Sequence, residues 1–142
     1  MGAPLARGPK VVCIDDQINN LRVRKLLLEQ FGCEVIAVSD PFTGLSEISS
    51  SKPDIVLLDY HLANGVTGEE VARDIRAVLP RVPIVFLTGD PHLPKSAHES
   101  VDAVLVKGAS SPADLLATIR RLVPDAFVKP VRPMMKPEDL AS

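Results

Sequence analysis

Cysteine is scarce in this sequence, and its scarcity excludes two kinds of site. The two cysteines, Cys13 and Cys33, are too few and too scattered to form a metal site. One is expected near the end of a strand and the other near the start of the next strand, a placement that does not favour a disulfide. We therefore predict that both are small, buried side chains of the core.

A large net charge of either sign and long apolar stretches are also missing. The formal net charge is −2, with 16 basic and 18 acidic residues. Such a balance favours neither nucleic-acid binding by the protein alone nor membrane contact, and the basic clusters "RVRK" and "IRR" are expected to be solvated helix flanks. No apolar run could cross a bilayer, and the first ten residues lack the apolar centre of a secretory signal, so we expect a cytoplasmic location.

One pattern is present and occurs five times: a short apolar run followed by a segment with helical spacing or helix-start residues. The runs are Val11–Ile14, Glu34–Val38, Ile55–Leu58, Ile84–Leu87 and Ala103–Val106. The fourth helical segment, near residues 91–100, holds two prolines and little apolar surface, so we expect a short, mobile helix. At 142 residues the chain has the length of one ordinary domain.

The apolar spacing also predicts which helical residues face the core. In the first helix these are Leu21, Leu27, Leu28 and Phe31, and the helix should end at Gly32 in the left-handed conformation. In the third helix they are Val71, Ala72, Ile75, Val78 and Leu79.

Alternating strands and helices predict an α/β fold with a doubly wound, five-stranded parallel sheet. The fully apolar runs at 11–14 and 55–58 suit central strands, and the more polar run at 34–38 suits an edge. The expected strand order is 2-1-3-4-5, as in a flavodoxin-like sandwich. In such sheets ligands bind beyond the carboxyl ends of the strands, between strands 1 and 3.

Polar side chains stand at four of these carboxyl ends. Asp15 and Asp16 follow the first strand, Asp59 the third, Thr88 the fourth and Lys107 the fifth. All five are expected to converge in one crevice. Three carboxylates there would repel one another, and Mg²⁺ suits the cluster because it binds carboxylates together with water and phosphate oxygens.

Asp59 is then a candidate nucleophile, because carboxylates form aspartyl-phosphate intermediates. Thr88 can donate a hydrogen bond to one phosphoryl oxygen and Lys107 can place its ammonium group on another. Simpler interpretations exist for each residue: a helix cap for Asp15 and Asp16, a turn for Asp59, a cap for Thr88 and a solvated charge for Lys107. They do not explain why all five fall at strand ends on one side of the sheet.

The segments "VVCIDD", "DIVLLDYHL" with the following "TG", "VFLTGD" and "AVLVKG" resemble, in this order and at these spacings, the receiver domains of two-component response regulators. The resemblance covers about Lys10 to Val123. It divides the chain into an N-terminal tail at 1–9, a receiver domain at 10–123 and a Pro-rich C-terminal tail at 124–142.

By this resemblance, Asp59 accepts a phosphoryl group from a histidine kinase or a histidine phosphotransfer protein, with Mg²⁺ as cofactor. The signal would leave through the face formed by the fourth helix, fifth strand and fifth helix, toward an effector that the sequence does not indicate. Such a domain promotes its own phosphorylation and dephosphorylation but is not a dedicated enzyme.

The resemblance also implies individual roles around the metal. Asp16 would bind it directly, Asp15 through water, and Asp59 and the backbone carbonyl of His61 would complete the protein ligands. Thr88 and Lys107 would hold the phosphoryl group.

Three positions depart from the family pattern. Ala63 stands where proline is common, in a loop one residue longer than the shortest versions. Gly108 instead of proline follows Lys107, which leaves the cis or trans state of that bond open. Val104 occupies the place of a switch tyrosine or phenylalanine, and its short, β-branched side chain is not suited to swing between buried and exposed sites.

Two other function classes remain as alternatives. A haloacid dehalogenase-type hydrolase also uses a strand-end Asp with Mg²⁺, Thr and Lys, but it should carry a second carboxylate at the position of His61 and a cap-domain insertion. A degenerate receiver would only bind a partner protein. The Pro-rich end is too short for a DNA-binding output domain, so the chain is expected to be either a stand-alone regulator or part of a longer protein.

Overall fold

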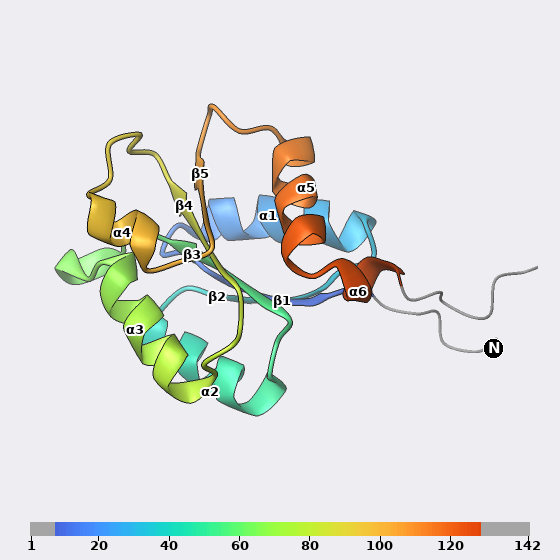
Figure 1. Ribbon diagram of the computed structural model, residues 1–142, viewed down its shortest axis with the longest axis horizontal. Helices are drawn as coiled ribbons and strands as arrows, with labels where there is room; N and C mark the ends of the chain where they lie inside the picture. The colour runs from blue at the N-terminus through green and yellow to red at the C-terminus, as the bar shows by residue number, and fades with distance from the viewer. Residues whose placement is uncertain (1–7, 129–142) are drawn as a thin grey trace, which may run out of the picture.

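The computed structural model describes residues 8–128, in which strands and helices alternate along the chain (Figure 1). The strands are β1 (Lys10–Ile14), β2 (Glu34–Val38), β3 (Ile55–Asp59), β4 (Ile84–Thr88) and β5 (Ala103–Val106). The helices are α1 (Ile18–Gln30), α2 (Pro41–Ser51), α3 (Gly68–Val78), α4 (Lys95–Glu99), α5 (Pro112–Leu122) and α6 (Pro124–Val128), and the 3-10 turn η1 spans Ala63–Gly65. The predicted strands are confirmed, and β3 and β4 extend by one residue to include Asp59 and Thr88.

The sheet has the order β2-β1-β3-β4-β5 with every neighbouring pair parallel, so the predicted fold class and topology are confirmed. Every residue of β3 and β4 is buried, whereas β2 at the edge is only partly buried. This difference explains why the central strands read as unbroken apolar runs.

Helices cover both faces of the sheet (Figure 1). Because successive strand residues point to opposite faces, each strand feeds two separate cores. One core joins Val12, Ile14 and Phe86 to buried residues of α2, α3 and α4. The other joins Cys13 and Leu57 to buried residues of α1 and α5. Burial of the two apolar faces fixes α1 and α5 on one side and α2, α3 and α4 on the other.

Two predicted core residues are in fact exposed. Phe31 is 46% exposed and Val78 is 44% exposed. Phe31 is the cap residue after α1, and its backbone angles are no longer helical. Val78 is the last residue of α3. Both residues therefore lie at the end of a helix. The sequence pattern treats them as helix-interior residues that face the core, but their side chains are exposed to solvent. Gly32 has the predicted left-handed conformation, with φ of 89°.

Two helices, α4 and α6, are short. α4 has five residues, as expected from its prolines, and Ala97 and Leu93 anchor this region in the core. Its mobility stays a prediction. α6 forms from the first residues of the predicted C-terminal tail, so helical structure continues past residue 123. Residues 1–7 and 129–142 of the two predicted tails lie outside the described residues.

Both cysteines are free and buried, as predicted. Burial raises the pKa of the Cys13 thiol to about 12 and that of Cys33 to about 11. Both side chains therefore act as protonated, apolar-like groups of the core. Within residues 8–128, no helix combines the length and the apolar character needed to cross a membrane.

Candidate functional site

Three carboxylates meet at the carboxyl edge of the sheet. Ile14 of β1 pairs in register with Leu58 of β3, so the residues that follow them, Asp15 and Asp59, come side by side. Asp16 completes the group, and one carboxylate oxygen from each of the three lies within 4.8 Å of the others. The parallel register thus assembles the acidic cluster that the strand ends predict.

Lys107 bridges two of these acids. Its Nζ lies 3.2 Å from Oδ1 of Asp59 and 3.3 Å from Oδ2 of Asp15, and the side chain is 31% exposed. The residue directly follows β5, and its backbone N–H donates to the carbonyl oxygen of Thr88 at 2.6 Å. The ammonium group therefore offsets part of the repulsion among the carboxylates.

Asp15 is fully buried and each of its carboxylate oxygens has a partner. Oδ1 accepts from the backbone N–H of Gln17 at 2.9 Å. Oδ2 is shared by Lys107 at 3.3 Å and by Nη1 of Arg24 at 3.4 Å. Complete burial of this carboxylate is tolerated because it is paired with cations and hydrogen-bonded.

Arg24 is the site residue that the sequence interpretation missed. It belongs to the "RVRK" cluster, whose side chains were expected to be solvated, yet its side chain is only 12% exposed and contacts Asp15. The position of Arg24 in the helix could have indicated its burial. Arg24 lies three residues after Leu21 and four before Leu28, and both leucines are buried. Residues at these spacings share one face of a helix, so Arg24 faces the sheet.

Asp59 is 6% exposed and its ionised form is disfavoured. Burial raises the pKa of the Asp59 carboxyl, the charges of Asp15 and Asp16 raise it further, and Lys107 opposes the shift. A cation placed against these carboxylates would oppose the shift and favour the ionised form of Asp59.

Thr88 is fully buried at the end of β4, one strand away from Asp59. Its Oγ1 accepts from the backbone N–H of Asp90 at 3.0 Å, which leaves the hydroxyl proton as a donor. In register Thr88 is paired with Val106, the residue just before Lys107. Thr88 and Lys107 therefore stand next to each other at the strand ends.

The loop after β3 has a defined path. His61 pairs with Thr67 in an isolated antiparallel bridge, and its ring is largely exposed, with Nε2 4.0 Å from Oδ2 of Asp90. Asn64 and Gly65 turn the chain with φ of 63° and 74°. Thr67 then begins α3 through a capping box with Glu70.

The structure also shows the conformation at the two other positions that depart from the family pattern, Gly108 and Val104. The peptide bond between Lys107 and Gly108 is trans, and Gly108 has φ of 84°. Val104 pairs in register with Phe86 and is partly buried against the core on the side of α3 and α4.

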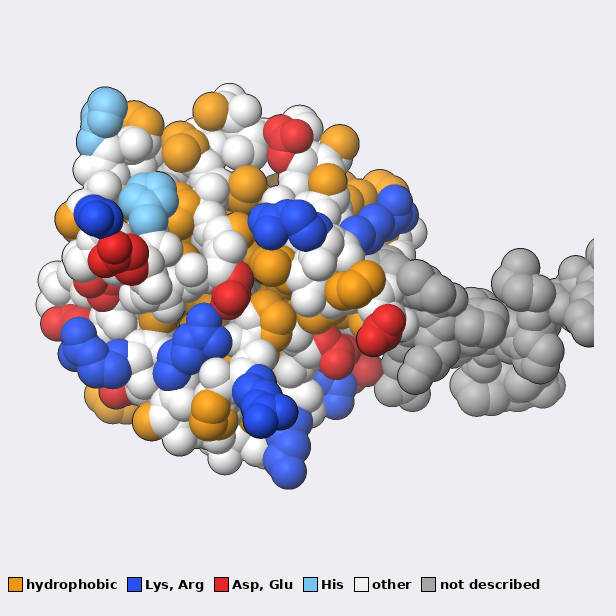
Figure 2. All heavy atoms as spheres, viewed as in Figure 1, with side chains coloured by type: hydrophobic (Ala, Val, Ile, Leu, Met, Phe, Trp, Pro, Cys, Tyr) orange, Lys and Arg blue, Asp and Glu red, His pale blue; other side chains and the backbone are white. Residues whose placement is uncertain are grey.

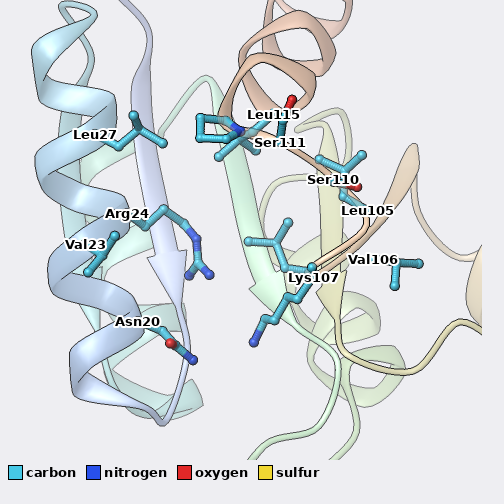
Figure 3. Close-up of a pocket in the computed structure, with 13 residues that line it drawn as sticks. Asn20, Val23, Arg24, Leu27, Leu105, Val106, Lys107, Ser110, Ser111 and Leu115 are labelled. Atoms are coloured by element: carbon cyan, nitrogen blue, oxygen red, sulfur yellow. The ribbon is translucent and has the colours of Figure 1, made fainter.

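A cavity of about 350 Å³ opens beside the acids, between α1 and the β5–α5 connection. Figure 3 shows Arg24 from α1 and Lys107 from the end of β5 pointing into the same gap, below Leu27 and Leu115. The cavity thus has a cationic end next to the acidic cluster and an apolar end between the two helices.

These observations define a class: a flavodoxin-like α/β protein with an acidic site and a lysine at the switch point of its sheet. Residues 11–120 match the family model of the response regulator receiver domain. The chain belongs to this family, whose members are receiver domains of two-component signalling systems.

Curated relatives include both sensor proteins and response regulators. The chain is 36% identical over 78 residues to the sensor protein GacS of Pseudomonas syringae pv. syringae, covering 54% of this chain and 8% of that protein. It is 30% identical over 124 residues to the DNA-binding response regulator MtrA of Mycobacterium leprae, covering 87% of this chain and 46% of that protein. The chain spans a tenth or less of the first curated relatives that it matches.

Solved structures agree on the fold. A receiver domain protein from Clostridium thermocellum superposes with a TM-score of 0.74 at 27% identity, covering 81% of this chain and 94% of that one. The receiver domain of a Pseudomonas aeruginosa PAO1 sensor histidine kinase, solved with magnesium in its active-site cleft, gives a TM-score of 0.74 at 24% identity, covering 82% and 98%. At that identity the likeness concerns the fold alone.

Proposed function

We propose that this chain is a phosphoacceptor receiver domain that takes a phosphoryl group onto Asp59 in a Mg²⁺-dependent reaction. The observation that carries the proposal is the position of Lys107, which bridges Asp59 and Asp15 inside a cluster of three carboxylates. A lysine over the nucleophile is already where a transferred phosphoryl group needs a positive charge.

The donor set fits a hard divalent cation. The ligand atoms are carboxylate oxygens that lie within 4.8 Å of one another, and two of the three acids are buried. Asp16 and Asp59 would bind Mg²⁺ directly, Asp15 through water, and the backbone carbonyl of His61 would add a further oxygen. When bound, the ion would neutralise charge on the phosphoryl oxygens and on the acids.

The chain's own residues then act on the phosphoryl group. A carboxylate oxygen of Asp59 forms the new bond to phosphorus, and the bond from phosphorus to the donor's histidine nitrogen breaks, with its electron pair left on nitrogen. Lys107 moves its ammonium group onto a phosphoryl oxygen, and Thr88 donates its hydroxyl proton in a hydrogen bond to another.

The partner on the input side is a histidine kinase or a histidine phosphotransfer protein. The relatives support this, since they include proteins named as sensor kinases and as response regulators. On the output side we propose that α4, β5 and α5 form the signalling face. The domain would promote its own phosphorylation and dephosphorylation in the cytoplasm without being a dedicated enzyme.

We propose no direct contact with nucleic acid or membrane. Acidic and basic side chains are interspersed on the face that Figure 2 shows, in keeping with the formal net charge of −2. The electrostatic attraction that supports nonspecific DNA binding is therefore small.

The two alternatives fit the site less well. A hydrolase of the haloacid dehalogenase type needs an acid two residues after the nucleophile, where this chain has the largely exposed His61. A receiver that only binds a partner would not need an intact Asp15, Asp59 and Lys107 with such close contacts.

Intact-mass spectrometry after incubation with acetyl phosphate tests the proposal. With Mg²⁺ we expect the wild type to gain one phosphoryl group and Asp59→Asn to gain none. Chelating the metal should abolish the gain in the wild type. Equal labelling of wild type and Asp59→Asn would reject Asp59 as the acceptor, and metal-independent labelling would reject the Mg²⁺ requirement.

A further inference from the structure

We propose that Arg24 sets the Mg²⁺ affinity of the site: by holding Asp15 paired when no metal is bound, it weakens metal binding and stabilises the metal-free domain. This inference rests on the proposed metal site, and it assigns a role to a residue outside the acids, Thr88 and Lys107.

The first support is the geometry around Asp15. Arg24 and Lys107 approach the same oxygen, Oδ2, at 3.4 and 3.3 Å from two different elements, α1 and the end of β5. Figure 3 shows the two side chains extending toward each other across the cavity. The other oxygen, Oδ1, is taken by the backbone N–H of Gln17. Asp15 therefore has its partners in place before any metal arrives.

The second support is the difference between the two cations. Lys107 is 31% exposed and also contacts Asp59, so it can follow a phosphoryl group on that residue. Arg24 is 12% exposed, and its contact within the site is with Asp15. The buried leucines Leu21 and Leu28 hold this face of α1 against the sheet. Arg24 therefore remains on Asp15 when Lys107 moves.

The third support is the charge balance. Three carboxylates and two cations leave the metal-free site with a formal charge of −1, whereas without Arg24 it would be −2. A divalent cation entering this site is repelled by Arg24 at short range, where burial reduces screening by solvent and salt. Removing Arg24 should thus strengthen metal binding and, in the absence of metal, leave a buried carboxylate with less compensation.

The test compares Arg24→Gln with the matched control Arg22→Gln by isothermal titration calorimetry with Mg²⁺ at low ionic strength. Both changes remove one positive charge from α1, but Arg22 is exposed. For Arg24→Gln we expect the Mg²⁺ dissociation constant to fall about three- to tenfold, as for a charge removed from a partly screened site. Arg22→Gln should stay close to the wild type.

Thermal unfolding with and without saturating Mg²⁺ supplies the second readout. Arg24→Gln should lower the midpoint without metal, and saturating Mg²⁺ should recover most of that loss. If Arg24→Gln does not fold, Arg24→Met, which keeps an unbranched side chain that packs well in a helix, replaces it.

Three other outcomes would each contradict a different part of the argument. Equal Mg²⁺ affinity of Arg24→Gln and Arg22→Gln would overturn the inference. A midpoint lowered to the same extent with and without metal, at unchanged affinity, would show that Arg24 only packs α1. A wild type that binds no Mg²⁺ would instead overturn the proposed metal site, and this inference with it.

Discussion

Nζ of Lys107 lies 3.2 Å from Oδ1 of Asp59, across a chain separation of 48 residues. β4 lies between β3 and β5, so the contact spans two strand spacings, about 10 Å at the backbone. Only a long side chain bridges that distance. The pairing of Asp59 with a cation is therefore a consequence of strand order together with side-chain length.

Lys107→Gln tests the importance of this contact for the proposed reaction. Glutamine is shorter and uncharged, so the phosphoryl group would lose a preorganised positive charge. We expect phosphorylation by acetyl phosphate to slow by about a hundredfold, a loss typical of removing one such donor. Lys95→Gln is the control, because Lys95 is highly exposed and pairs with Glu99 on the same helix. Similar rates for the two variants in a mass-spectrometric time course would contradict the prediction.

The raised pKa of Asp59 predicts a pH-dependent stability of the metal-free protein. A carboxyl whose folded-state pKa is raised contributes stability below its ordinary pKa, and this contribution is lost as pH rises through the folded-state pKa. At neutral pH we expect Asp59→Asn to be more stable than the wild type by about 1 kcal/mol, the scale of ordinary single substitutions. The difference should vanish below the ordinary carboxyl value of 3.8.

Asp40 provides a control of opposite sign. The backbone N–H of Thr43 donates to its carboxylate at the start of α2 and lowers the pKa of Asp40. The ionised Asp40 carboxylate therefore stabilises the folded protein at neutral pH, and this stabilisation is lost as the pH falls through the folded-state pKa of Asp40. Urea unfolding of Asp40→Asn should show destabilisation at neutral pH that disappears in acid. An Asp59→Asn profile that follows the same course would refute the sign assigned to Asp59.

Gly68 allows the close approach of α3 to the end of β3. A Cβ at this position would lie 2.8 Å from Cε1 of Phe86, 3.0 Å from Cα of Tyr60 and 3.3 Å from the carbonyl oxygen of Asp59. Because two of these neighbours are backbone atoms, we expect Gly68→Ala to destabilise the fold by about 1–3 kcal/mol. Gly89→Ala should change stability by less than about 0.5 kcal/mol, since nothing lies within 4 Å of its Cβ position. Denaturant unfolding compares the two; equal effects would contradict the prediction.

Val104 predicts a restricted response to phosphorylation. The side chain is short, has a stiff χ1 and packs beside Phe86. With a fluoroberyllate mimic we expect amide shifts at Thr88 and throughout residues 91–100, and little change at Val104. The short helix α4 has few core anchors, so reordering it costs little free energy. NMR and hydrogen exchange measure this response. Large changes in amide shift or exchange rate at Val104 and α5, with none in residues 91–100, would disprove the prediction. Asp59→Asn with the mimic is the control.

The sequence by itself determined the five strands, their order, and the five polar residues at the strand ends. These follow from local information: apolar runs mark buried strands, and parallel strands bring their carboxyl ends to one edge. Asp15, Asp59 and Lys107 could therefore be placed together without coordinates, although their roles remain proposals.

Only the tertiary structure decided which atoms meet. Arg24 was interpreted as a solvated charge, because a sequence pattern does not show how closely α1 packs over β1 and brings the guanidinium to Asp15. The sequence pattern likewise did not predict three further features: the exposure of Phe31 and Val78, the left-handed turn at Asn64 and Gly65, and the formation of α6. Helix ends, turns and ion pairs depend on contacts between residues far apart in the chain, and a local periodicity does not encode those contacts.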